Sequence, residues 1–91
     1  MRVQAQVSIY PLKTKTLAKP VEEFCRRLRD PDLTVTTHSM STLIVGESER
    51  VFQAVKQAFE ALAADFNIVV DLKISNACPN DVETQCKKKV D

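Results

Sequence analysis

Glycine is almost absent from this sequence, because Gly46 is the only one among its 91 residues. Loops that cradle phosphate groups need several closely spaced glycines, so a phosphate-binding loop of that kind is excluded. Tryptophan is missing, and aromatic residues make up only 5% of the chain. The formal net charge is +1, which supplies no basic surface for a polyanion. We therefore expect no nucleic-acid partner.

Cysteine pairs and long apolar runs are missing too. The three cysteines, Cys25, Cys78 and Cys86, include no closely spaced pair, so they indicate neither a disulfide framework nor a Cys-x-x-Cys metal site. We expect reduced thiols and no bound metal. No apolar stretch reaches the roughly 18 residues of a membrane span, and no apolar leader follows a basic start. We expect a cytoplasmic protein with no membrane partner.

The sequence also lacks the combinations of residues that catalysis requires. No nucleophile with a base, no acid–base pair and no metal-ligating cluster stands at a recognisable spacing. His38 is the only histidine, and a lone histidine without a carboxylate or cysteine at ligand spacing is more often structural. We therefore expect a protein that is not an enzyme and that uses no cofactor.

What the sequence does contain is sufficient for one small folded domain. Apolar residues make up 44% and charged residues 27% of the chain, which is typical of a globular protein. We expect a single domain over residues 1–91, in which 77–91 form an irregular tail because they show no clear periodicity. A chain of this length buries only about 60–65% of its unfolded surface. Self-association into a homodimer or homotetramer is therefore expected.

Hydrophobic periodicity predicts the elements of the first half. Residues 3–10 alternate between apolar and polar side chains, which is typical of a half-buried strand, and Pro11 is expected to end it. An apolar stripe at helical spacing follows; Thr16 is a candidate cap for this helix, which must end before Pro31. The stripe consists of Leu17, Val21, Phe24, Cys25 and Leu28.

The second half repeats this pattern. Residues 33–39 and 41–45 predict two short strands that meet near Met40 in a hairpin without glycine. Ser48 can cap a second helix, and residues 68–75 alternate as a final strand. The stripe of this helix is Val51, Phe52, Val55, Phe59, Leu62 and Phe66. The order predicts a ferredoxin-like α+β sandwich, β-α-β-β-α-β, with a four-stranded antiparallel sheet and both helices on one face.

The alternation divides the strand residues between the two faces of this sheet. The helix-covered face is expected to take Val3, Ala5, Val7, Ile9, Val35, Leu43, Val45, Val70, Leu72 and Ile74. The open face is expected to take Gln6, Ser8, Tyr10, Thr34, Thr36, His38, Thr42, Ile44, Asp71 and Lys73. Its hydroxyls, amides and carboxylate can bind the donor and acceptor edges of a heterocycle. A solvated sheet face is the alternative, since antiparallel sheets often face water.

Three segments carry a resemblance to a known family: Val7-Ser8-Ile9-Tyr10-Pro11-Leu12, Met40-Ser41-Thr42-Leu43-Ile44-Val45-Gly46 and Leu72-Lys73-Ile74. They resemble the thiamine-binding, YkoF-like family of ferredoxin-like proteins, and the similarity extends over most of the predicted fold. The resemblance implies a non-catalytic protein that binds thiamine or its hydroxymethylpyrimidine portion and assembles through sheet surfaces. Carriage, buffering and sensing of the vitamin all remain open.

The resemblance and the open face together give the candidate ligand-binding residues Ser8, Tyr10, Met40, Ser41, Thr42, Asp71 and Asn76. Ser8 and Thr42 suit the hydrogen-bonding aminopyrimidine. Asp71 either accepts from its amino group, balances the thiazolium, or forms a surface ion pair. Tyr10 either stacks on a ring or packs in an interface, while Met40 either forms an apolar wall or covers the hairpin.

Other non-catalytic functions share this strand order. A structural oligomerisation protein and a regulatory amino-acid-binding module both remain alternatives to thiamine binding. An RNA-binding module would instead present stacked aromatic residues on its central strands, where Tyr10 is the only one in this chain.

Overall fold

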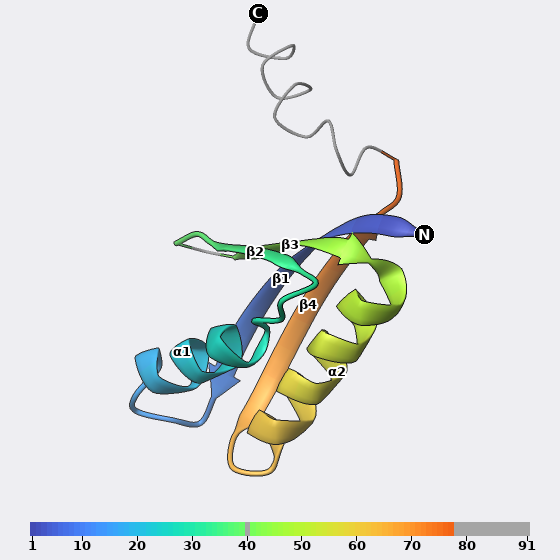
Figure 1. Ribbon diagram of the computed structural model, residues 1–91. Helices are drawn as coiled ribbons and strands as arrows, with labels where there is room; N and C mark the ends of the chain where they lie inside the picture. The colour runs from blue at the N-terminus through green and yellow to red at the C-terminus, as the bar shows by residue number, and fades with distance from the viewer. Residues whose placement is uncertain (40, 78–91) are drawn as a thin grey trace, which may run out of the picture.

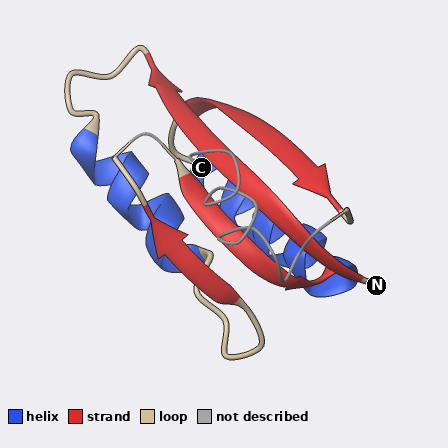
Figure 2. Ribbon diagram, turned by 90° about the horizontal axis from the view of Figure 1, so that it is seen from above, coloured by secondary structure: helices blue, strands red, loops and turns tan. Residues whose placement is uncertain are grey.

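The computed structural model describes residues 1–39 and 41–77. In chain order the elements are β1 (Arg2–Leu12), α1 (Ala18–Arg27), β2 (Thr34–Thr37), β3 (Thr42–Glu47), α2 (Ser48–Ala63) and β4 (Asn67–Ser75). The strands form one antiparallel sheet in the order β2-β3-β1-β4, and both helices lie against one face of it (Figures 1 and 2). The predicted ferredoxin-like α+β fold is confirmed. Met40 and residues 78–91, which include Cys78 and Cys86, lie outside the described residues.

Strand β1 is longer than the sequence pattern predicts. It does not stop before Pro11 but pairs with β4 as far as Leu12. Its pairing with β3 ends at Val7, so the later part of β1 has no β3 neighbour on that side. Proline is tolerated at such a strand edge, because it removes no ladder hydrogen bond there.

The two helices begin without the caps that the sequence predicts. Leu17 rather than Thr16 precedes α1, and Ser48 is the first residue of α2 instead of its cap. Neither N-cap residue makes a side-chain hydrogen bond. The Thr16 N–H instead donates to Thr14 Oγ1 (3.3 Å) within the preceding loop. Packing of the apolar helix faces, rather than capping, therefore holds both helices in place.

The hydrophobic core lies between the two helices and the covered face of the sheet. Its buried members are Val3, Ala5, Val7, Phe24, Leu28, Leu33, Ile44, Val51, Ala54, Val55, Ala58 and Leu62. Each fully buried aliphatic or aromatic side chain contributes about 1.5–3 kcal/mol relative to an exposed one. Phe52 and Phe59, expected on the apolar stripe of α2, are exposed instead. The core stripe of α2 is therefore narrower than predicted.

The register of β3 overturns the predicted face assignment of this strand. Val3, Ala5 and Val7 of β1 lie opposite Gly46, Ile44 and Thr42 respectively. Residues opposite each other in antiparallel strands share a face, so Thr42 and Ile44 point toward the helices, while Leu43 and Val45 point to the open face. The reverse assignment was wrong because residues 43–45 are all apolar. Such a run has no alternation from which a face can be read.

Gly46 lies where β3 passes the chain that enters β2. A Cβ atom at this position would lie 2.5 Å from Leu33 Cδ2 and 3.3 Å from the backbone oxygen of Asp32. Leu33 is itself a buried core residue, so its side chain has little room to move. Close packing, rather than a turn, therefore requires the single glycine of the chain.

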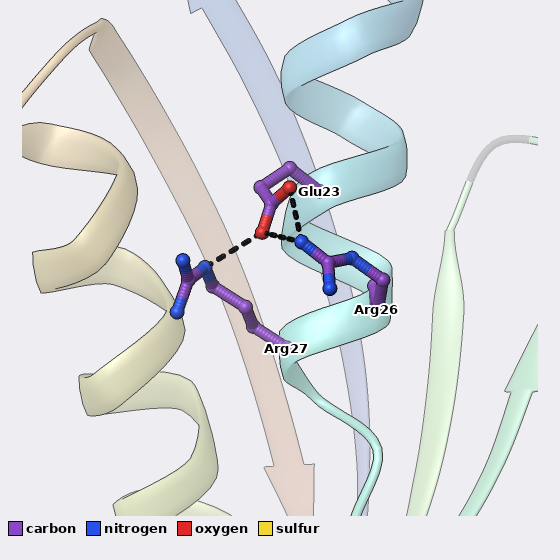
Figure 3. Close-up of polar contacts among 3 residues, drawn as sticks. All are labelled: Glu23, Arg26 and Arg27. Carbon is purple, nitrogen blue, oxygen red and sulfur yellow. Dashed lines mark hydrogen bonds and ion pairs between the residues drawn. The ribbon is translucent and has the colours of Figure 1, made fainter.

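An ion-paired cluster stabilises the exposed side of α1. Arg26 Nη2 donates to both carboxylate oxygens of Glu23, and Arg27 Nε lies 2.9 Å from Glu23 Oε2 (Figure 3). The hydrogen bond from Arg26 is the largest cause that holds the pKa of the Glu23 carboxyl below its ordinary value. Arg26 and Arg27 also lie in the last turn of α1, where cations interact favourably with the helix dipole.

We predict that Gly46→Ala lowers the free energy of unfolding by about 1–3 kcal/mol, because the added methyl group overpacks against Leu33. Leu33→Ala alone should cost about 2–5 kcal/mol through the cavity it leaves. In the double variant the new methyl group enters that cavity, so the combined loss should be smaller than the sum of the two. Urea unfolding of the parent and the three variants measures these free energies. Strictly additive losses would contradict the proposed packing of the methyl group against Leu33.

We also predict that Glu23→Gln changes how stability depends on pH. A carboxyl whose pKa is lowered by folding contributes stability above its unfolded pKa and loses that contribution as the pH falls through the folded pKa. The variant should therefore be less stable than the parent at neutral pH, and the difference should shrink as the pH falls below about 4. Glu22→Gln is the matched control, since no described ion pair includes Glu22. A constant difference from pH 7 to pH 3 would be the contrary result.

Candidate functional site

A pocket forms where the pairing of β1 with β3 ends. Strand β3 begins at Thr42, opposite Val7, whereas β1 continues for five more residues beside β4 alone. The space beside this part of β1 is bounded by α1 and by the β2–β3 hairpin, and it has a volume of about 280 Å³. We call it the α1–hairpin pocket. Its lining residues are Val7, Ser8, Ile9, Tyr10, Val21, Phe24, Cys25, Thr37, His38, Ser39, Ser41 and Thr42.

Helix α1 supplies the apolar wall of the α1–hairpin pocket. Val21, Phe24 and Cys25 come from consecutive turns of one helix face, and Phe24 is also a core residue. Cys25 Sγ lies 3.4 Å from Thr42 Oγ1, within the range of a thiol–hydroxyl hydrogen bond. Thr42 is only 3% exposed, so this contact satisfies a hydroxyl that would otherwise be costly to bury.

The hairpin forms the polar side of the pocket, and two hydrogen bonds fix its position. The His38 backbone N–H donates to the Ser41 carbonyl oxygen at 2.7 Å. The side chain of Gln6 donates from Nε2 to Ser41 Oγ at 3.1 Å. Since that Ser41 oxygen acts as the acceptor, its own hydroxyl hydrogen is directed elsewhere. The Ser41 hydroxyl can therefore donate a hydrogen bond to a polar ligand.

Four of the predicted ligand-binding residues come together in this pocket: Ser8, Tyr10, Ser41 and Thr42. They come from both faces of the sheet, since Thr42 lies under α1 and Ser8 lies on the open face. The prediction that all of them lie on the open face was therefore wrong. Tyr10, at 52% exposed, stands at the rim.

The other predicted residues are not among those that line the pocket. Asp71 lies on β4 directly opposite Ser8, and its side chain is exposed on the open face. Asn76 follows Ser75, which pairs with Gln4 at the other end of β1, so Asn76 is remote from the pocket. Met40 lies outside the described residues.

Sequence reasoning missed the contribution of α1. Val21, Phe24 and Cys25 were interpreted as a core stripe, and Thr37 was given no role. The apolar stripe of α1 is the feature that could have indicated this contribution. A helix that covers two strands of unequal length leaves part of its apolar face over the region that the shorter strand does not reach. Only the strand register shows where that gap lies.

The α1–hairpin pocket is chemically neutral and suited to a small ring. Its lining combines aliphatic, thiol, aromatic, imidazole and hydroxyl groups, and none of the lining residues carries a carboxylate or an ammonium group. Apolar walls with a few converging polar groups are the usual composition of a small-molecule site. Such a pocket can hold a heterocycle through packing and hydrogen bonds, but its own side chains do not balance a full charge.

Other recesses are larger, with volumes of about 330–410 Å³, and two of them are strongly charged. One, of about 380 Å³, lies between the end of α1 and the start of α2, and there Arg50 Nη2 pairs with Asp30 Oδ2 at 2.5 Å. The other, of about 410 Å³, lies between the opposite ends of the helices, where Glu23 and Arg27 pair. In each of these two recesses one ion pair joins groups of opposite charge, so part of the charge of the lining is already balanced.

Two general features of the described residues bear on function. Neither α1 nor α2 has the length and apolar character that a membrane crossing requires. Among residues 1–39 and 41–77, no three His, Cys, Asp or Glu side chains are grouped so that they could hold a metal ion.

Comparison with known proteins places this fold in a family. The profile of the family described as thiamine-binding protein matches residues 5–91. The UPF0045 protein MJ1052 of Methanocaldococcus jannaschii is 32% identical over 91 residues, covering 98% of this chain and 89% of the relative. Its crystal structure, that of a hypothetical protein, superposes with a TM-score of 0.82 at 30% identity, covering 98% of this chain and 96% of the other.

A more distant structure shares the same fold. It is a Thermotoga maritima protein assigned provisionally to thiamine biosynthesis or salvage, with a TM-score of 0.80, 17% identity and coverage of 98% of this chain and 99% of the other. At that identity the likeness concerns the fold alone. The profile match and the M. jannaschii relative establish that this chain belongs to the thiamine-binding protein family.

Proposed function

We propose that this protein binds thiamine, or its hydroxymethylpyrimidine portion, in the α1–hairpin pocket, and that it does so without catalysing a reaction or using a cofactor. The observation that carries the proposal is that Ser8, Tyr10, Ser41 and Thr42 line one neutral pocket at the end of the β1–β3 ladder. Membership of the thiamine-binding protein family supports this choice of ligand. The provisional assignment of the T. maritima protein is consistent with it.

The aminopyrimidine ring matches the polar groups of the pocket. It presents a hydrogen-bond donor next to ring-nitrogen acceptors, and a binding site must pair with both. A strand edge alternates N–H donors and carbonyl acceptors, and β1 presents such an edge where β3 is absent. The hydroxyls of Ser8 and Ser41 add groups that both donate and accept. We expect the ring to lie beside β1 with its amino group toward the hairpin.

The cationic thiazolium ring belongs outside the pocket. A charge moved into an apolar site without a partner is strongly disfavoured, and the pocket lining has no carboxylate to offset it. Tyr10 stands at the rim, where its ring face can attract a cation. Asp71 lies one strand further across the open face. We expect the pocket to hold the pyrimidine and the rim to hold the thiazolium.

The size and charge of the pocket disfavour phosphorylated forms. Its volume of about 280 Å³ is at the lower limit of the roughly 300–1,000 Å³ typical of small-molecule sites. No lysine or arginine lines it. A phosphate group would therefore have to remain in solvent, and it should add no affinity.

Assembly through the open sheet face is the second part of the proposal. This face exposes Tyr10 and Val69 among polar residues, and Leu43 and Val45 lie on it partly buried. Packing of two such faces would remove these apolar side chains from water. We propose a cytoplasmic homodimer or homotetramer, in which a second sheet lies over the rim of the pocket.

Titration calorimetry with purified protein tests the choice of ligand. We expect thiamine and hydroxymethylpyrimidine to bind with affinities within about tenfold of each other, because the pyrimidine makes most of the contacts in a neutral pocket. Thiamine phosphates should bind no more tightly than thiamine. Heat from free amino acids but from no thiamine-like ligand would instead support a regulatory module. The absence of heat from every ligand would leave structural oligomerisation as the function.

Single hydroxyl deletions test the site. Ser8→Ala and Ser41→Ala should each weaken binding of hydroxymethylpyrimidine by about 1–3 kcal/mol, since a polar atom of the buried ring would lose its partner. Thr36→Ala is the matched control, because this threonine lies exposed on the open face and does not line the pocket. Circular dichroism checks the fold of each variant. Equal affinity in all four proteins would place the ligand elsewhere.

A further inference from the structure

The lining of the α1–hairpin pocket contains His38, the only histidine of the chain. Histidine is the side chain that ordinarily gains a proton between pH 8 and pH 5. The other titratable residues of this lining are Tyr10 on β1 and Cys25 on α1, and phenols and thiols ordinarily stay neutral below about pH 8. Among the described residues that line the pocket there is no carboxylate, lysine or arginine. The charge of the lining near neutral pH therefore depends on His38.

The β2–β3 hairpin holds His38 at the pocket through its backbone. The His38 N–H donates to the Ser41 carbonyl oxygen at 2.7 Å, and the side chain of Gln6 on β1 donates to Ser41 Oγ at 3.1 Å. The His38 side chain itself is exposed, and none of the ion pairs among the described residues includes it. A proton on the imidazole therefore adds a positive charge that no carboxylate in the lining balances.

This charge acts at short range on a ligand in the pocket. A volume of about 280 Å³ is that of a sphere about 8 Å across, so a charged group in the pocket or at its rim lies close to His38. Two positive charges at this separation, in the dielectric found near a protein surface, lower a binding constant by about three- to tenfold. A neutral ligand does not experience this repulsion.

We propose that His38 is a specificity-determining residue of the α1–hairpin pocket, which accepts cationic ligands when the imidazole is neutral and disfavours them when it is protonated. The inference rests on the proposed binding of thiamine, whose thiazolium ring carries a positive charge throughout this pH range. The protein should retain thiamine at about pH 8 and release it progressively as the pH falls through the range in which histidine gains its proton. Bound thiamine should in turn disfavour protonation of His38.

Calorimetric titration of the parent and of His38→Gln with thiamine, from about pH 8 to about pH 5.5, tests this role. Glutamine keeps the backbone N–H and a polar side chain but cannot gain a proton. Over this range the affinity of the parent should fall by about three- to tenfold relative to that of His38→Gln. Protonation of the pyrimidine of the ligand affects both proteins, so the ratio of their affinities isolates the imidazole. In about 1 M salt the ratio should stay near one, because salt screens the repulsion.

A relocated histidine is the matched control. In Thr36→His/His38→Gln the imidazole lies two residues earlier, on β2, at an exposed position that does not line the pocket. This variant should bind thiamine with the same pH dependence as His38→Gln, because its imidazole is farther from the ligand and is surrounded by water. A full return of the pH dependence would show an effect of overall charge and would overturn the role of position 38.

Proton NMR gives a second measurement, which a single histidine makes simple. One imidazole Cε1–H signal reports the protonation of His38, since the chain has no other histidine. Saturating thiamine should move the midpoint of this titration to lower pH by about 0.5–1, which corresponds to a three- to tenfold coupling. A midpoint that thiamine does not move, or equal pH dependence in the parent and His38→Gln, would overturn this inference and leave thiamine binding intact. Absence of thiamine binding at about pH 8 would overturn both proposals.

Discussion

The unequal pairing of the central strand β1 is the constraint on which the rest of this structure depends. β1 pairs with β3 only as far as Val7 but with β4 as far as Leu12. Because β3 is short, α1 covers a part of the sheet where one strand is missing. The α1–hairpin pocket occupies that position. A sheet with strands of equal length would have placed side chains there and closed the site.

Thr42 adds a buried hydroxyl to the polar residues that line the pocket. A threonine under a helix must find a hydrogen-bond partner, and Cys25 of α1 provides it at 3.4 Å. The same contact joins the start of β3 to α1 beside the pocket. Apolar packing and hydroxyl chemistry therefore meet at one place in the molecule. This combination is suited to a neutral heterocycle and unsuited to a free phosphate.

The amino-acid sequence by itself determined the element order and the fold class, because the alternation in residues 3–10 and 68–75 and the two helical stripes are unambiguous. It also indicated Ser8, Tyr10, Ser41 and Thr42 as candidate ligand-binding residues, and all four line the α1–hairpin pocket. It could not give the face of β3, since Leu43, Ile44 and Val45 are all apolar.

Only the tertiary structure decided to which face of the sheet the β3 side chains point, that Phe52 and Phe59 are exposed, and that residues of α1 line the pocket. The physical reason is that a local pattern specifies which residues prefer to be buried but not what they are buried against. Strand register and unequal strand length are relations between distant segments. They fixed where Thr42, and with it the candidate site, came to lie.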